Sequence, residues 1–214
     1  MKDIKRLFID IETSKAPDAE LFEPEYKEPK RNKDGSVSAT SKTVEQQREE
    51  WLSKCALSPL TGQVLMCGIS LNENIECFYI DKVVLANENE LLQSICDGIN
   101  YTDLIIGHYI KSFDLPFIIN RCRKHGITPP NVGYMARGRW VWNENIIDLA
   151  DLWTFNKYGE YISLNNMAKY FGLKPKDETI GENFEQVFNE DIEKAIAYCK
   201  YDVTLTKQIY ERLR

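Results

Sequence analysis

Residues 6–13, RLFIDIET, form an apolar run that is typical of a buried strand, yet two carboxylates lie in the middle of it. Because side chains alternate between the faces of a strand, Asp10 and Glu12 share one face and the neighbouring isoleucines share the other. The Cα atoms of the two acids are then roughly 6.5 Å apart, at about 3.3 Å of rise per residue. Two carboxylates at this spacing can bracket a hard divalent cation, which offsets the cost of burying charge. The alternative is an edge strand with one solvated face.

The composition is that of an ordinary soluble globular protein. The 214 residues are 43% hydrophobic and 28% charged, and this length favours a single domain over residues 1–214 with its own core. A net charge of -6 argues against a nucleic-acid binder that works through bulk positive charge, but it allows a local basic track around an acidic metal site.

The cysteines and the N-terminus predict the compartment. The six cysteines include no C-x-x-C pair, and the chain has only two histidines, so we expect no structural zinc site. Scattered cysteines in mostly apolar contexts are typical of a reducing compartment. The first residues, MKDIKRLFID, lack a signal-peptide pattern, and no apolar run approaches transmembrane length. We therefore expect a cytoplasmic protein.

The order of the predicted elements indicates an α/β fold. Residues 14–50 are rich in charge and proline and predict a long surface insertion, which a short helix within 43–57 follows. Strands are predicted at 63–71 and 75–80, as a hairpin, and within 103–109 and 145–153. Helices are predicted to begin at Asn87, Ser112, Ser163 and near Glu190, with Gly126 and Gly172 as helix stops. Strands first, then strands mixed with helices, predict a mixed sheet with a leading antiparallel meander.

Two further places carry acids that a metal would bind. Asp114 falls in the first turn of the helix after the strand at 103–109, where the helix dipole alone stabilises an acid by about 0.3–1 kcal/mol. Tyr198 and Asp202 are four residues apart in the last helix, so they lie on one face, one turn apart. Taken singly, Asp114 is explained as a first-turn acid, and the Tyr198–Asp202 pair as an ordinary pair at the rim.

Together the three motifs resemble the DEDD superfamily of 3′→5′ exonucleases. FIDIET (8–13), SFDLPF (112–117) and YCKYDV (198–203) look most like the proofreading domain of family-B DNA polymerases and the small stand-alone exonucleases related to it. The tyrosine branch is the better match, because the histidine branch needs a histidine at the position of Ala197. The resemblance implies the ribonuclease H-like α/β fold, in which helices flank a mixed sheet.

The resemblance implies a site with two divalent cations, Mg²⁺ or Mn²⁺, and four carboxylate ligands. Two metals about 3.5–4 Å apart serve both ends of an in-line displacement at phosphorus. Asp10 would bridge the ions, Glu12 and Asp202 would hold the ion that activates water, and Asp114 would act mostly through water on the other ion. Tyr198 has too high an ordinary pKa, about 10, to serve as a general base, so we expect its hydroxyl to orient the attacking water.

The implied substrate is the 3′ end of single-stranded nucleic acid, with DNA favoured over RNA and nucleoside monophosphates as products. By resemblance, the backbone from Ile11 to Thr13 and the ring of Phe113 would meet the terminal nucleotide, the ring by stacking. RCRKHG (121–126) and YMARGRWVW (134–142) combine basic and aromatic residues that would guide a single strand. The alternative is that both are ordinary solvated faces and core aromatics.

The chain departs from the family pattern in two features. Tyr109 stands where the second motif usually carries asparagine, which puts a substrate contact in doubt but not metal binding. The insertion at 14–50 is larger than the family minimum. Asp148 and Asp151 are rival acids, which we interpret as helix caps.

Two other functions compete with an exonuclease. DIET (10–13) superficially resembles the D-x-D-x-T nucleophile motif of haloacid-dehalogenase-like phosphatases, but that chemistry needs a second Asp where Glu12 stands. The other is a catalytically weak nucleic-acid-binding member of the same fold. The presence of all four acids and Tyr198 argues against it, because clustered like charge is costly without a metal.

Overall fold

The structure is a computed structural model of the chain, and it describes residues 4–36, 38, 41–71, 74–79, 87–131, 144–155, 157 and 160–214. Part of the predicted hairpin turn and the whole of the basic, aromatic segment 134–142 lie outside these residues. Within the described part, no helix has both the length and the apolar character needed to cross a membrane.

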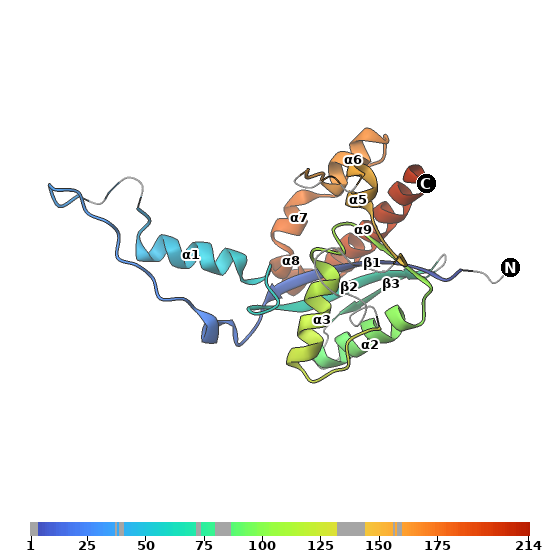
Figure 1. Cartoon of the computed structure of the whole chain (residues 1–214), viewed down its shortest axis with the longest axis horizontal. Helices are drawn as coiled ribbons and strands as arrows, with labels where there is room; N and C mark the ends of the chain where they lie inside the picture. Colours follow the sequence, from blue (N-terminus) through green and yellow to red (C-terminus); the bar gives the residue numbers. More distant parts are fainter. Residues whose placement is uncertain are drawn as a thin grey trace. The chain divides into compact units, whose positions relative to one another are not determined.

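The described strands form one mixed sheet in the order β3-β2-β1-β4-β5 (Figure 1). Strands β2 and β3 pair antiparallel, whereas β4 pairs parallel with both β1 and β5. This arrangement confirms the predicted α/β class and the antiparallel hairpin. The strands are β1 Arg6–Lys15, β2 Gly62–Leu71, β3 Asn74–Tyr79, β4 Leu104–Gly107 and β5 Ile146–Asp148.

The helices begin and end largely where local sequence predicts. The side chains of Asn87 and Ser163 accept hydrogen bonds from the first turns of their helices, and Gly126 and Gly172 take the left-handed conformation at helix ends. The described helices are α1 Val44–Cys55, α2 Glu88–Asn100, α3 Asp114–Lys124, α5 Leu149–Thr154, α6 Leu164–Tyr170, α7 Glu178–Glu182, α8 Phe184–Glu190 and α9 Ile192–Leu213, with a 3-10 helix at Ala19–Phe22.

The prediction that Ser112 caps α3 is wrong. The helix begins at Asp114, and the Ser112 hydroxyl donates to the carbonyl of Tyr109 instead. Tyr109 has a positive φ of 56°, and the backbone N–H groups of Ser112 and Phe113 both donate to its carbonyl. The Ser112 hydroxyl is therefore bonded within the turn between β4 and α3 and is not available to cap the helix.

Apolar clusters lie on both faces of the sheet. Ile9 and Ile11 of β1 belong to the cluster formed with α2 and α3, whereas Phe8 packs with α6 and α9. The strand alternation therefore directs Asp10 and Glu12 to the α9 face. Helix α9 approaches this face closely at Gly68 of β2, where an added Cβ would be 2.7 Å from a methyl of Val203.

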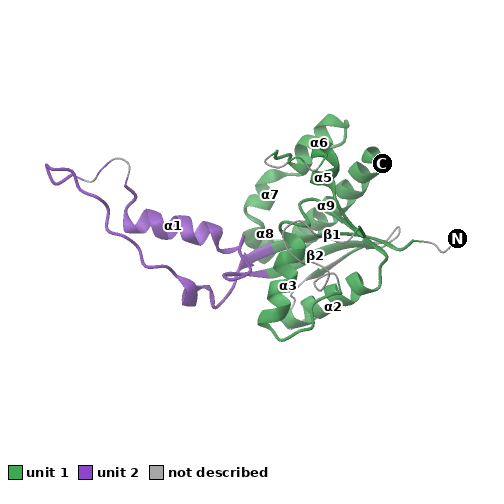
Figure 2. Cartoon of the chain, viewed as in Figure 1, with its two compact units in different colours: residues 1–12, 64–214 green, residues 13–63 purple. Residues whose placement is uncertain are grey.

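The chain divides into two compact units, residues 1–12 with 64–214, and residues 13–63 (Figure 2). The second unit contains the predicted insertion and α1. In it the N–H of Ala16 donates to the carbonyl of Thr61, and the Thr13 hydroxyl donates to the carbonyl of Ala56. That residues 1–214 form a single domain stays a prediction.

Candidate active site

Three acids from two elements converge on the α9 face of the sheet. Asp10 and Glu12 lie half-buried on β1, and Asp202 lies fully buried on α9. One carboxylate oxygen of each lies within 4.8 Å of the other two. The alternating face predicted for β1 and the helical face predicted for α9 therefore meet.

Asp114, the fourth predicted acid, reaches the same place from the first position of α3. Its buried carboxylate accepts a hydrogen bond of 3.0 Å from the backbone N–H of Ile11, which lies between Asp10 and Glu12 on β1. Burial, followed by the negative charge of Asp10, raises the pKa of Asp114 well above its ordinary value. Asp114 is therefore a first-turn acid that also lies beside the three clustered acids and interacts electrostatically with Asp10.

Lys176 is a member of the site that the sequence analysis missed. Its Nζ lies 2.7 Å from Oδ2 of Asp202. Burial lowers the pKa of Lys176, but the negative charges of Asp202 and Asp10 outweigh this effect and raise it above its ordinary value. The lysine is therefore charged and partly neutralises the acids. Its segment is fixed by buried Asn165 of α6, which accepts from the backbone N–H and donates to the carbonyl of Lys176, at 2.8 and 3.1 Å.

Tyr198 lies one turn before Asp202 on α9, as predicted, and it is buried. Burial, followed by the negative charge of Asp202, raises the pKa of its hydroxyl, so the hydroxyl stays protonated at neutral pH. The backbone of α7 passes close to this hydroxyl at Gly181, where an added Cβ would be 2.5 Å from the oxygen. Gly181 is therefore a second residue that only the structure reveals.

The three residues predicted to meet the substrate are largely engaged within the chain. The N–H of Ile11 donates to Asp114, and the Thr13 hydroxyl donates to Ala56. The Phe113 ring is partly buried and lies 5.6 Å from the ring of Phe117, between centroids. Their role toward a terminal nucleotide stays a prediction.

The rival acids have structural roles. Buried Asp148 caps α5 by accepting from the N–H of Ala150, which confirms the prediction, and it also accepts from the N–H groups of Tyr109 and Lys111. The prediction that Asp151 is a cap is wrong, because it lies inside the first turn of α5 and pairs with Lys111 at 2.9 Å.

One part of the predicted basic track is also wrong. Arg121 is buried, and its Nε donates to Oε1 of Glu88 at 2.8 Å. Glu88 in turn accepts from the N–H of Val64. A buried guanidinium needs such a partner, so Arg121 joins α2 to α3 rather than facing a nucleic-acid strand.

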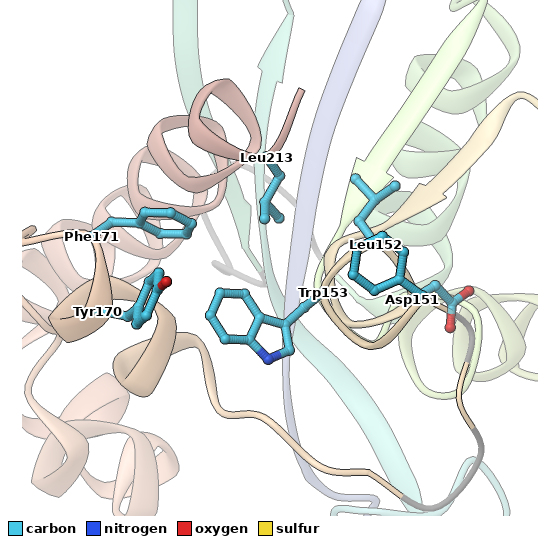
Figure 3. A pocket seen from close by; sticks show the side chains of 7 residues that line it. Asp151, Leu152, Trp153, Tyr170, Phe171 and Leu213 are labelled. Atoms are coloured by element: carbon cyan, nitrogen blue, oxygen red, sulfur yellow. The ribbon is translucent and has the colours of Figure 1, made fainter.

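The described part of the chain also contains a pocket of about 540 Å³ (Figure 3). In it the Trp153 ring meets the rings of Tyr170 and Phe171 edge-on. Its lining contains none of the four acids, Lys176 or Tyr198. The lining residues are Asp151, Leu152, Trp153, Phe155, Tyr170, Phe171 and Leu213.

The family comparison covers more than half of the chain. A family model described as a predicted 3′-5′ exonuclease related to the exonuclease domain of PolB matches residues 63–214. The chain belongs to this family. The residues that match this PolB-related exonuclease family include Asp114, Tyr198 and Asp202, whereas Asp10 and Glu12 precede the matched segment. The predicted resemblance to the family-B proofreading domain is therefore confirmed.

The fold of this member of the PolB-related exonuclease family is similar to that of a solved structure. The chain is similar to the family B DNA polymerase from the hyperthermophilic archaeon Pyrobaculum calidifontis, with a TM-score of 0.64 and 15% identity. The match covers 99% of this chain and 24% of the polymerase, so the chain spans about a quarter of that protein's length. The mixed five-stranded sheet with flanking helices is thus the ribonuclease H-like exonuclease fold. None of the curated proteins matches the chain.

The acidic cluster predicts how the stability of the metal-free protein depends on pH. Burial, followed by the negative charge of Asp10, raises the pKa of Asp202 from 3.8 to about 7. The folded chain then keeps a proton that the unfolded chain releases. This bound proton stabilises the folded chain fully below pH 3.8, and the stabilisation is lost as the pH rises through about 7. We expect the melting temperature in EDTA to fall across this window, and to fall less steeply in Asp202→Asn. Equal slopes in the two proteins would contradict the raised pKa.

Proposed function

We propose that the chain is a metal-dependent 3′→5′ exonuclease that hydrolyses single-stranded nucleic acid, DNA in preference to RNA, and releases nucleoside monophosphates. The observation that carries this proposal is the meeting of acids from β1, α3 and α9 beside one lysine and one tyrosine hydroxyl. Membership of the PolB-related exonuclease family supports the reaction class and leaves the phosphatase alternative without support.

The residues of the cluster fit a hard divalent cation such as Mg²⁺ or Mn²⁺. Carboxylate oxygens are the ligands that these ions prefer. Oδ1 of Asp202 is buried and makes no hydrogen bond within the described part of the chain, which leaves one oxygen free for an ion. Asp10, Glu12 and Asp202 would hold the ions, and Asp114 would act on them through water. Two bound ions supply an activated water and stabilise the leaving oxygen.

The other polar groups of the site position the reactants. The protonated hydroxyl of Tyr198, one turn from Asp202, is suited to orient the attacking water, because it can donate and accept a hydrogen bond without titrating at neutral pH. Lys176 offsets part of the negative charge: its ammonium pairs with Asp202, and Asn165 fixes the backbone of Lys176. We expect a phosphate that enters the site to meet this positive charge.

The test is degradation of single strands labelled at the 3′ or the 5′ end, as DNA and as RNA, with Mg²⁺, Mn²⁺ or EDTA. We expect shortening from the 3′ end with either ion, none in EDTA, and resistance of a strand whose 3′ end is blocked. Equal cleavage of circular and linear strands would indicate an endonuclease. Binding of the strand without cleavage would indicate the catalytically weak alternative.

Gly181→Ala is expected to lower the rate of strand hydrolysis by up to about 10²–10³-fold, the cost of displacing one positioned hydrogen-bonding group. The added Cβ would meet the Tyr198 hydroxyl at 2.5 Å, so the hydroxyl must move. Gly98→Ala in α2 is the matched control, because an added Cβ there meets no atom within 4 Å. We expect Gly98→Ala to keep the rate, measured as initial velocity at saturating Mn²⁺. Equal rates in the two variants would show that the position of the hydroxyl does not matter.

A further inference from the structure

We propose that the stacked rings of Tyr109 and Tyr161 form a binding site for a nucleobase of the single strand, upstream of its 3′-terminal nucleotide. This inference rests on the proposed nuclease function. It adds to the acidic site a stacking contact with a base, which the acids cannot make.

The two rings form a flat, pre-ordered surface. Their centroids are 5.2 Å apart and their planes differ by 7°, so the rings stack in parallel. Tyr109 stacks on the Tyr161 ring, and Tyr161 is nevertheless 77% exposed, which leaves most of its surface available to a ligand. A ring already fixed by a neighbour loses little conformational entropy when a base stacks on it.

Tyr109 is a rigid base for this surface. It holds a positive φ of 56°, a conformation that bulky side chains adopt only when other contacts enforce it. Its N–H donates to Asp148 at 2.9 Å, and its hydroxyl accepts from the N–H of Ile162 at 2.9 Å. The edge of the His108 ring packs against it, with centroids 4.6 Å apart. The hydroxyl bond to Ile162 fixes the backbone beside Tyr161, which asparagine at position 109 is too short to do in the same way.

The surface is built on the two segments that position the site. Asp114 lies five residues after Tyr109, at the end of the same turn. On the other side, Ile162 precedes the cap of α6, and Asn165 of α6 holds Lys176 beside Asp202. The segments that position Asp114 and Lys176 therefore also carry the two tyrosine rings. A single-stranded nucleic acid whose 3′ end reaches the acids would have this aromatic surface available.

The chemistry of the surface favours an unpaired base as its occupant. Every base has a flat π face, so stacking on a tyrosine tolerates any sequence, as an exonuclease requires. Bases in a duplex are already covered on both faces, whereas a single strand can present one to a protein ring. The site therefore selects for single strands without reading their sequence.

The variant Tyr161→Ala tests this site, with Tyr161→Phe as the conservative variant that keeps the ring. Tyr101→Ala is the matched control: Tyr101 is also exposed, at 60%, and Nζ of Lys5 lies 3.4 Å from its ring centroid. Lys5 is five residues before Asp10 on the extended chain, roughly 16 Å away. The control therefore removes an exposed tyrosine ring near the start of β1, away from the acids.

Two substrates separate stacking from chemistry. One is a short oligothymidylate, and the other is thymidine 5′-(methyl phosphate), which has a single nucleoside and no base or other ring on the upstream side. We expect Tyr161→Ala to raise KM for the oligonucleotide by roughly 5- to 150-fold, the range that corresponds to one lost base–aromatic stack, with kcat nearly unchanged. Hydrolysis of the small substrate should be unchanged, and Tyr161→Phe and Tyr101→Ala should behave like the wild type.

A binding measurement keeps this inference separate from the proposed function. Fluorescence anisotropy with labelled oligothymidylate and Ca²⁺ reports affinity without hydrolysis. A strand that lacks one base near its 3′ end should bind the wild type more weakly, and that loss should vanish in Tyr161→Ala. If the wild type binds but never cleaves, the proposed function fails while the stacking site stands. Four results would each overturn the stacking site. The first two are an affinity for the strand that is unchanged in Tyr161→Ala, and an equal loss of affinity in Tyr101→Ala. The others are slower hydrolysis of the small substrate by Tyr161→Ala, and a wild type that binds no strand.

Discussion

Asp10→Ala is expected to lower the rate of strand hydrolysis by more than about 100-fold. The loss of a residue that only supports a metal ligand costs up to about 100-fold, and the loss of a ligand itself should cost more. The metal-free variant should nevertheless melt at the same temperature as the wild type or higher. Burial raises the pKa values of all four acids, and the negative charge of Asp10 raises those of Glu12, Asp114 and Asp202 further. Removing it relieves repulsion among the remaining acids. The measurements are melting curves in EDTA and initial rates in Mn²⁺.

Asp148→Ala is the contrasting variant for this prediction. Asp148 is also a buried acid, but it accepts hydrogen bonds from three backbone N–H groups, those of Tyr109, Lys111 and Ala150. Each buried donor left without a partner costs about 1–3 kcal/mol, so this variant should melt well below the wild type. If Asp10→Ala lost as much stability in EDTA as Asp148→Ala, Asp10 would be a structural acid rather than a metal ligand.

Tyr198→Phe is expected to lower turnover by about 10²–10³-fold, which is the cost of one positioned hydrogen bond lost in a transition state. The ring and its packing against Phe184 remain, since the ring centroids lie 6.0 Å apart and the hydroxyl takes no part in that contact. The Mn²⁺ concentration for half-maximal rate should not change, because the hydroxyl is not a ligand in this account.

Asp202→Asn, one turn along the same helix, separates the two roles. It removes a ligand charge and also the partner of Lys176, so it should raise the Mn²⁺ concentration for half-maximal rate as well as lower turnover. The comparison is a titration of rate against Mn²⁺ for both variants. Full activity of Tyr198→Phe at saturating metal would make Tyr198 a packing residue.

Much of the fold was predictable because its signals are local. The two-residue period of β1 correctly placed Ile9 and Ile11 in one core and Asp10 on the opposite face. Side-chain caps at Asn87 and Ser163 act within one helical turn, so the sequence contains the whole interaction. Ser112 failed as a cap because a backbone turn at Tyr109, which depends on tertiary contacts, intervenes before the helix.

The site was predictable in its acids and in Tyr198, and the meeting of these residues came from the family resemblance rather than from spacing. Asp10 and Asp114 are about a hundred residues apart, and no local pattern joins them. Lys176 gave no signal, because its position depends on Asn165 and Asp202, which lie 11 and 26 residues away. Gly181 was missed for a related reason: its role is to leave room for a hydroxyl from another helix.

The most direct test of the metal-dependent acid site is the product pattern from a 5′-labelled single strand. The wild type and Asp10→Ala are compared in Mn²⁺ and in EDTA, with the released products identified by mass spectrometry. The account predicts a ladder that shortens one nucleotide at a time from the 3′ end, with nucleoside monophosphates released, only for the wild type in Mn²⁺. Cleavage that persists in EDTA or in Asp10→Ala would contradict it.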